Sequence, residues 1–294
     1  MEPKRRSRFA GWVAAACLSA GAVTSGVSLA ETDDQYTLSN KWESARKRLG
    51  LLEDFSNPFT FDALEKANIQ PGWHCLDAGA GLGGITRWLA HKVGPDGSVD
   101  ALDMEPGFLK EIPDKNVYVL EQNLVNDDLP EATYDFIFAR DVLMHIPQQE
   151  LVINKLVKAL KPGGFLMTED LGVLRKGIAF QKLTDNQAVN DLGAELFEAI
   201  QEGGHMSFRA TFDSPFYFRE AGLIDVESNG AVPLARGGSI EGEVTELSLQ
   251  QLKPLFMKKG YDEKNYDIYM QSFMNEKSLW WGFIRVTTTG RKPS

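Results

Sequence analysis

The sequence predicts an α/β fold, and three observations point to it. Apolar segments with strand character alternate along the chain with segments whose apolar residues have helical spacing. A glycine-rich turn joins the first predicted strand to the helix that follows it. The 294 residues are 43% hydrophobic, which is enough to bury one substantial core with a small added cap.

The glycine-rich turn lies between residues 76 and 84 and is the most informative part of the chain. Glycines at alternate positions let a ligand lie against the backbone, because they have no Cβ atom. The helix that begins there offers free N–H groups to an anionic group such as a carboxylate. The spacing Gly79-x-Gly81-x-x-Gly84 also fits the dinucleotide fingerprint. Asp77 favours S-adenosyl-L-methionine over a dinucleotide as the ligand of this loop. Its carboxylate repels a pyrophosphate and attracts the ammonium and sulfonium groups of S-adenosyl-L-methionine.

A second acidic residue, Asp103, ends the short strand predicted at 97–104. A carboxylate at this place can accept hydrogen bonds from ribose hydroxyls, which suits NAD equally well. Further strands are predicted at 116–121, 134–139, 165–168, 224–234 and 278–290, and helices at 36–52, 148–160, 186–201, 248–259 and 262–276.

Several motifs follow the glycine loop in a fixed order. They are Asp103, Asn123, the blocks 134–140 and 143–147, and the Lys-Pro-Gly-Gly turn in 160–164. Their order and spacing resemble the class I S-adenosylmethionine-dependent methyltransferases, in particular the small-molecule enzymes similar to the ubiquinone-biosynthesis C-methyltransferases. The resemblance spans about residues 36–293. It implies a Rossmann-like, doubly wound, mostly parallel seven-stranded sheet with an inserted helical cap.

The resemblance also implies the residues of the site. The methyl group is transferred by in-line displacement from S-adenosyl-L-methionine to an oxygen, nitrogen or carbon nucleophile, so positioning supplies most of the acceleration. A base is needed only where the nucleophile must lose a proton. The expected cofactor-binding residues, with Leu124 against the adenine, are Asp77, Gly79, Ala80, Gly81, Asp103, Met104, Asn123, Leu124 and Arg140.

Four side chains are candidate bases, and each has a structural alternative. His145 either accepts a proton or orients its loop, and Glu169 and Asp170 either face the sulfonium or cap the next segment. His205 has a solvated loop position as its alternative. Arg140 is expected to pair with the neighbouring Asp141 or with a substrate carboxylate, the local ion pair being favoured.

Three parts are predicted along the chain. Residues 1–30 resemble a signal peptide or N-terminal anchor, with a basic segment at 4–8, an apolar run at 9–23 and a small-x-small site at 28–30. Residues 31–70 form an N-terminal helical lid, and residues 71–294 form the methyltransferase domain with a cap insertion at about 171–219. The protein is therefore expected to be exported or periplasmic, and membrane-anchored where the segment stays uncleaved. The alternative is a cytoplasmic protein whose true start lies near Tyr36.

The charge and the composition of the chain indicate which classes of substrate and ligand it binds. The net charge is −10, and the residues after the first thirty carry −13, which disfavours nucleic acid and favours a small-molecule methyl acceptor. The four histidines show no paired spacing with each other or with cysteine, so no metal is expected. The sequence leaves the oligomeric state open. Two alternative functions are an exported non-catalytic ligand-binding protein and a nicotinamide oxidoreductase, and the position of Asp77 disfavours the second.

Overall fold

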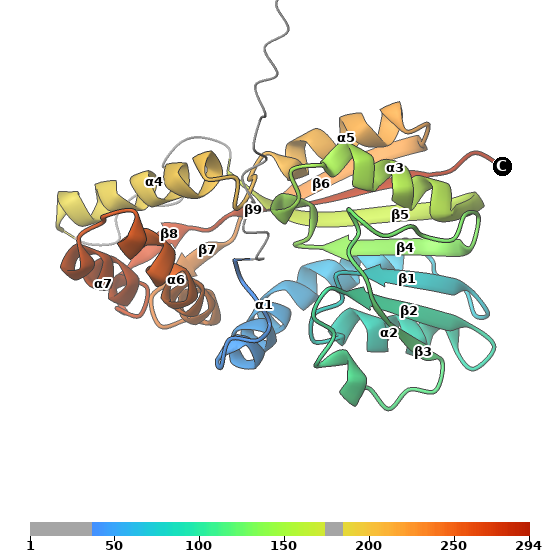
Figure 1. Cartoon of the computed structure of the whole chain (residues 1–294), viewed down its shortest axis with the longest axis horizontal. Helices are drawn as coiled ribbons and strands as arrows, with labels where there is room; N and C mark the ends of the chain where they lie inside the picture. The colour runs from blue at the N-terminus through green and yellow to red at the C-terminus, as the bar shows by residue number, and fades with distance from the viewer. Residues whose placement is uncertain (1–36, 174–184) are drawn as a thin grey trace, which may run out of the picture. The chain divides into compact units, whose positions relative to one another are not determined.

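The structure is a computed structural model that describes residues 37–173 and 185–294 (Figure 1). All of these residues belong to one unit, which covers residues 35–294. The predicted signal peptide or anchor at 1–30 lies outside the described residues, and so does Tyr36. Within the described ranges, no helix is long and apolar enough to cross a bilayer.

A seven-stranded sheet forms the centre of this unit, in the order β3-β2-β1-β4-β5-β9-β6 (Figure 1). The first five of these strands are parallel, and β9 runs antiparallel to both of its neighbours. The chain order reverses between β1 and β4, and in open α/β sheets ligands generally bind outside the carboxyl ends of the strands at such a reversal. The predicted α/β fold with a doubly wound, mostly parallel sheet is confirmed. The strands of this sheet are β1 His74–Ala78, β2 Ser98–Asp103, β3 Val117–Glu121, β4 Tyr134–Arg140, β5 Leu160–Gly172, β6 Ile224–Ala231 and β9 Ile284–Arg291.

Helices cover both faces of the sheet. On one face, α2 and the end of α1 bury Leu64, Ile85 and Leu89 against Phe136 and Phe138 of β4. On the other face, α3 and α5 pack against β5 and its neighbours. Burial on both faces explains the apolar runs in the middle of these strands, such as residues 136–139 of β4. The helices of this part are α1 Ala45–Lys66, α2 Gly84–Val93, α3 Gln149–Ala159 and α5 Ala210–Glu220, with short 3-10 turns η1 Leu109–Glu111 and η2 Leu143–His145.

The remaining elements form a cap that is built mainly from α4, α6 and α7. Helix α4 contacts α7, α7 contacts α6, and α6 contacts α1. Asn186, Ser239 and Asp262 begin these three helices, and each side chain accepts a hydrogen bond from a backbone N–H of the first turn. A separate two-stranded sheet of β7 and β8 completes the cap. The cap elements are α4 Gln187–Glu202, β7 Leu234–Arg236, α6 Ile240–Lys258, α7 Glu263–Ser272 and β8 Leu279–Trp281.

Several elements differ from their predicted ranges. Helix α6 begins eight residues before the predicted 248, and β5 extends beyond the predicted 165–168 at both ends. The first helix is longer and begins later than the predicted 36–52, and it continues through Pro58. The strand predicted at 278–290 is divided into β8 and β9. Within the predicted insertion at 171–219, α5 packs on β5, β6 and β9 and therefore belongs to the sheet layer. The proposed boundaries of lid and cap stay predictions.

Candidate cofactor site

The loop after β1 has the backbone that the sequence predicts for a ligand loop. Gly79, Gly81 and Gly83 have φ angles of +78°, +57° and +80°, which side chains with a Cβ rarely adopt. A Cβ added to Gly79 would overlap the side chain of Val142, just beyond the end of β4. The loop after β1 and the loop after β4 therefore touch at the place where the strand order reverses.

Asp77 lies beneath this loop and is almost completely buried. It is 3% exposed, and the hydroxyl of Thr86 in α2 donates to Oδ2 at 2.6 Å. Burial raises the pKa of Asp77 to about 6, while the Thr86 hydrogen bond and the charge of Arg140 act in the opposite direction. Near neutral pH the site thus holds a desolvated carboxylate that a cationic group would stabilise.

Asp103 faces the same loop from the end of β2. Its Oδ2 accepts the N–H of Gly81 at 2.9 Å, and its Oδ1 accepts the N–H of Glu105 at 2.8 Å. Burial raises the pKa of Asp103. The backbone N–H of Ala80 donates to Leu102 at 3.0 Å, so the turn is fastened to β2 on both sides. Met104 follows with 47% of its surface exposed.

Asn123 and Leu124 lie in the turn after β3, beside the end of β2. The Asn123 side chain accepts the N–H groups of Val125 and Asn126 at 2.8 and 3.3 Å, so it stabilises its own turn. Leu124 is 7% exposed and belongs to the main apolar core. Hydrogen bonds join Gly81 to Asp103 and residues 79 and 80 to Leu102, whereas Asp77 is held beneath the loop by Thr86. The turn that holds Asn123 and Leu124 follows Gln122, whose N–H donates to the Asp103 carbonyl at 3.2 Å.

Helix α1 lies next to the glycine loop. The sequence predicted a helical lid, but it did not predict which residues of that helix contact the loop. Glu53 Oε1 accepts the N–H of Gly84 at 2.8 Å, so a carboxylate from α1 lies at the start of α2. Leu49 approaches the position of Gly81, and Gly50 lies beside Leu82. No sequence pattern links Glu53 to a loop 31 positions away, so only the tertiary structure reveals this contact.

A network of buried and partly buried polar residues connects the ends of β4 and β5 to α1 and β9. We call Thr60, Arg140, Asp141, Glu169 and Arg285 the β4–β5 clamp. Arg285 Nη1 lies 3.2 Å from Asp141 Oδ1 and 3.0 Å from Glu169 Oε1. Thr60 donates to Glu169 at 2.9 Å and receives a hydrogen bond from Arg140 at 2.9 Å. Sequence analysis missed Thr60 and Arg285 because both lie far along the chain from the strand ends.

The clamp corrects the expectation for Arg140. Its guanidinium donates to Asn57 and Thr60, both in α1, and not to the neighbouring Asp141. Asp141 pairs with Arg285 instead. The backbone of Asp141 has a φ of +54°, so the chain turns sharply after β4 and adjacent side chains no longer alternate as they do within a strand.

The candidate bases at the end of β5 are both buried. Glu169 is fully buried, and Thr60, Arg285 and Thr287 donate to its two oxygens. Asp170 is 1% exposed and accepts the N–H of Met144, and burial raises its pKa well above its ordinary value. The geometry therefore favours a structural role for Glu169.

The two candidate histidines lie close to each other. His145, in η2, makes a hydrogen bond with the backbone of His205, and burial lowers its pKa to about 4. The ring is therefore neutral at pH 7 but weakly basic, which favours orientation of the loop over proton abstraction. His205 Nδ1 lies 3.2 Å from the hydroxyl of Thr37.

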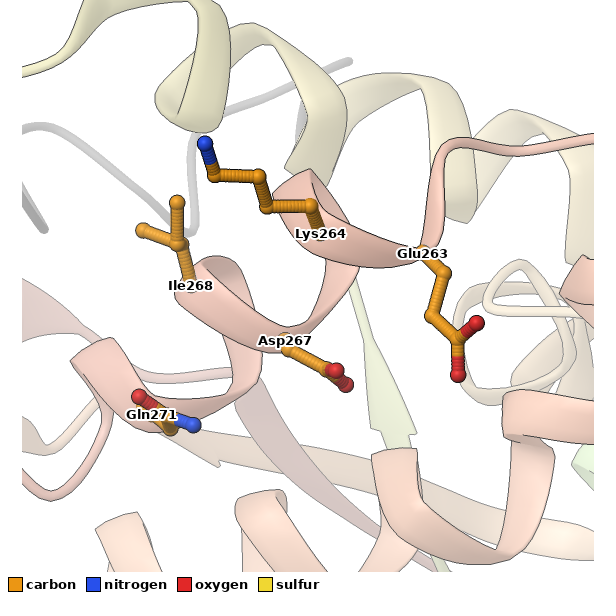
Figure 2. A pocket seen from close by; sticks show the side chains of 5 residues that line it. All are labelled: Glu263, Lys264, Asp267, Ile268 and Gln271. Atoms are coloured by element: carbon orange, nitrogen blue, oxygen red, sulfur yellow. The ribbon is translucent and has the colours of Figure 1, made fainter.

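A surface pocket of about 520 Å³ lies elsewhere, on α7. Figure 2 shows its lining, which consists of Glu263, Lys264, Asp267, Ile268 and Gln271, all from this one helix. Lys253 of α6 pairs with Glu263 and Asp267 at 2.9 and 2.7 Å, as expected for a solvated helix face. Among the described residues, no group of three potential metal ligands occurs. The pocket on α7 carries none of the predicted site residues.

The family model described as a methyltransferase domain matches residues 76–166. This span runs from β1 into β5 and includes the glycine loop, Asp103 and Arg140. Over these residues the match supports the resemblance to class I methyltransferases that was drawn from the motifs.

Curated relatives match between about a third and about half of this chain. A demethylmenaquinone methyltransferase of a Geobacillus species is 31% identical over 110 residues, which are 35% of this chain and 47% of the relative. The phosphoethanolamine N-methyltransferase 2 of Caenorhabditis elegans is 36% identical over 33% of this chain and 23% of its own length. A demethylmenaquinone methyltransferase of Geobacillus kaustophilus is 26% identical over 56% of this chain and 77% of its own. The chain spans less than half of the first two relatives.

Solved structures share the fold over a longer stretch. A chain from the complex of the Haloferax volcanii Trm112 methyltransferase activator has a TM-score of 0.52 and 15% identity, covering 86% of this chain and 96% of that chain. The YcgJ protein of Bacillus subtilis has a TM-score of 0.50 and 14% identity, covering 85% and 99%. These likenesses show that the fold, with its mostly parallel seven-stranded sheet, is shared with known structures.

Proposed function

We propose that the protein transfers the methyl group of S-adenosyl-L-methionine to a small-molecule acceptor. The observation that carries the proposal is the buried carboxylate of Asp77 beneath a loop of left-handed glycines, with Asp103 bound to the loop at Gly81. Two acidic side chains and an open backbone suit a ligand that has an ammonium, a sulfonium and a ribose and lacks phosphate. The match to a methyltransferase domain supports the same conclusion.

The side chains at the site position the reactants. The bound cofactor supplies an activated methyl carbon, and the protein needs to hold the acceptor in line with it. Asp77 offsets positive charge at the glycine loop, and Asp103 offers carboxylate oxygens at the end of β2. The β4–β5 clamp keeps α1 over the strand ends, which excludes water from the site.

The acceptor is proposed to be a small molecule with an oxygen, nitrogen or carbon nucleophile. The matched relatives are named for demethylmenaquinone and for phosphoethanolamine, which are both small molecules. The net charge of −13 beyond residue 30 is consistent with this class and disfavours a nucleic-acid substrate. The comparisons give no support to a non-catalytic binding protein. Export directed by residues 1–30 stays a proposal.

A transfer assay tests this function. The purified protein is incubated with S-adenosyl-L-methionine and, separately, a demethylmenaquinone analogue or phosphoethanolamine, and release of S-adenosylhomocysteine is measured. We expect acceptor-dependent release, lowered about 100-fold or more in Asp77→Asn, because this carboxylate is desolvated and therefore interacts strongly with the cofactor. Asp62→Asn, an exposed acid on α1, serves as the matched control. Equal release by Asp77→Asn and the wild-type protein would contradict the proposed site.

A further inference from the structure

The β7–β8 ribbon has an unusual outer face. In its register, Leu234 lies opposite Trp281, and Arg236 lies opposite Leu279. Because side chains alternate across a strand, these four side chains share one face and Ala235 and Trp280 share the other. We call the set of Leu234, Arg236, Leu279 and Trp281 the ribbon face.

The ribbon face is apolar although it is exposed. Leu234, Leu279 and Trp281 are 48%, 45% and 43% exposed, whereas Ala235 and Trp280 are 1% and 4% exposed. The inner Trp280 packs edge-on against Phe273, with ring centroids 5.1 Å apart. A strand with one face in water usually has polar side chains on that face. The inner face thus fills the cap, and packing within the cap does not account for the outer face.

More exposed apolar side chains adjoin the ribbon in the chain. Val232, Ile240 and Met274 are 39%, 44% and 38% exposed. With the three apolar residues of the ribbon face they make six of the thirteen large apolar side chains that are exposed among the described residues, all within residues 232–240 and 274–281. Such a concentration marks an interaction surface, because isolated exposed apolar residues are normal and clusters are not.

We propose that the ribbon face docks on the surface of a lipid bilayer. Tryptophan favours the boundary between headgroups and hydrocarbon, and the two leucines can insert beside it. Arg236 lies on the same face, where its guanidinium can reach lipid phosphates while its aliphatic stem stays in the apolar layer. The face thus combines the three kinds of side chain that bind at a bilayer interface.

The place where the N-terminal segment joins the cap favours a bilayer, rather than a protein, as the partner of the ribbon face. Thirty-six residues precede Thr37, and they include a basic segment at 4–8 and an apolar run at 9–23. The described chain begins at the cap, where the Thr37 hydroxyl lies 3.2 Å from His205 and Gln251 donates to the Ser39 carbonyl at 2.9 Å. A segment that associates with a membrane would therefore join the protein at the cap, which also carries the ribbon face.

Docking by this face would bring the carboxyl ends of the parallel strands, where Arg285 pairs with Leu171 of β5, toward the bilayer. Trp281 ends β8, and β9 begins three residues later with Ile284 and the clamp residue Arg285. Phe283 lies between them and stacks on Phe208 at 5.4 Å. This consequence, and not the docking itself, rests on the proposed function.

Vesicle binding by the full chain tests the proposal. Wild-type protein is sedimented with vesicles of phosphatidylethanolamine and phosphatidylglycerol beside two double variants. Leu279→Ser with Trp281→Ser removes two apolar side chains of the ribbon face. Tyr118→Ser with Phe216→Ser, which are 55% and 65% exposed in β3 and α5, is the matched control. We expect the ribbon variant to bind at least about tenfold more weakly and the control to bind like the wild-type protein.

A second measurement distinguishes this surface from other interfaces. Hydrogen exchange of residues 232–240 and 274–281 should slow when vesicles are added, and exchange in β3 should not change. The proposal is overturned if the wild-type protein does not bind vesicles or if the ribbon variant binds them equally well. Loss of self-association in the ribbon variant, with unchanged vesicle binding, would overturn it too, because the face would then join two copies of the chain. Methyl transfer to a water-soluble acceptor is measured separately, so failure of the proposed function remains distinguishable.

Discussion

At the scale of single residues, Asp77 shows how a binding group lowers the stability of its own fold. Its pKa is raised from 3.8 to about 6, chiefly by burial. The native protein therefore binds this proton more tightly than the unfolded chain, and the contribution of Asp77 to stability falls as pH rises from about 4 through about 6. The shift of about two pKa units corresponds to roughly 3 kcal/mol at neutral pH. A cationic ligand would recover part of this free energy.

The affinity for S-adenosyl-L-methionine should therefore increase with pH. If the ionised carboxylate binds the cofactor, the dissociation constant at pH 5 should be about tenfold higher than at pH 7.5, since the pKa lies near 6. Calorimetric titrations at both pH values measure the ratio. Asp77→Asn is the control, and its residual affinity should not change in this way. An equal pH dependence in that variant would assign the titration to another group.

At the scale of elements, α1 shows where local sequence preferences yield to tertiary contacts. Proline in a helix interior removes a hydrogen bond and usually ends the helix, yet α1 continues through Pro58. Asn57 and Thr60, on either side of it, are held by Arg140 and Glu169. Glu53 fastens the same helix to the start of α2. These contacts lie over the loop and the strand ends, so the position of α1 determines access to the site.

Removal of the Glu53 carboxylate should loosen α1 from the glycine loop. In Glu53→Ala the amide of Gly84 loses its acceptor, and we expect its hydrogen exchange to accelerate about fivefold to thirtyfold, as the loss of a cap worth about 1–2 kcal/mol implies. Asp54→Ala changes an exposed acid one position away and should leave this amide unaffected. Equal exchange in the two variants would show that Glu53 does not hold the helix.

At the scale of the whole molecule, the β4–β5 clamp joins segments that are far apart in sequence. Arg285 of β9 pairs with Glu169 across 116 positions and with Asp141 across 144 positions. Arg285 and Glu169 are 5% and 0% exposed. A buried pair contributes little against a well-packed apolar replacement, but removal of one partner leaves an uncompensated buried charge.

Arg285→Met should accordingly destabilise the protein by about 3–5 kcal/mol, measured as the free energy of unfolding in urea. Arg291→Met is a matched control in the same strand, because Arg291 pairs with Asp225 at 2.6 Å at the surface. The control should cost less than about 1 kcal/mol. Similar costs for both variants would contradict the role given to the clamp.

The features that the sequence predicted depend on local contacts, and the features that it did not predict depend on contacts between distant segments. The glycine loop follows from a short motif, the alternate glycines after Asp77, whose backbone requirements are local, and the doubly wound sheet follows from the resemblance that several such motifs carry. The partners of Arg140, the place of Glu53 and the division of the last strand into β8 and β9 depend on segments that meet only in the folded chain. Burial also favours structural roles for His145 and Glu169 over roles as bases. The sequence could not predict this, because exposure and pKa depend on the folded structure.

Calorimetric titration with S-adenosylhomocysteine and, separately, with NAD tests the central claim most directly, because it asks which ligand the loop above Asp77 holds without requiring the acceptor. We predict saturable binding of S-adenosylhomocysteine to the wild-type protein, no detectable binding of NAD, and much weaker binding of S-adenosylhomocysteine to Asp77→Asn while Asp62→Asn binds normally. Binding of NAD alone, or of neither ligand to the folded protein, would contradict the account.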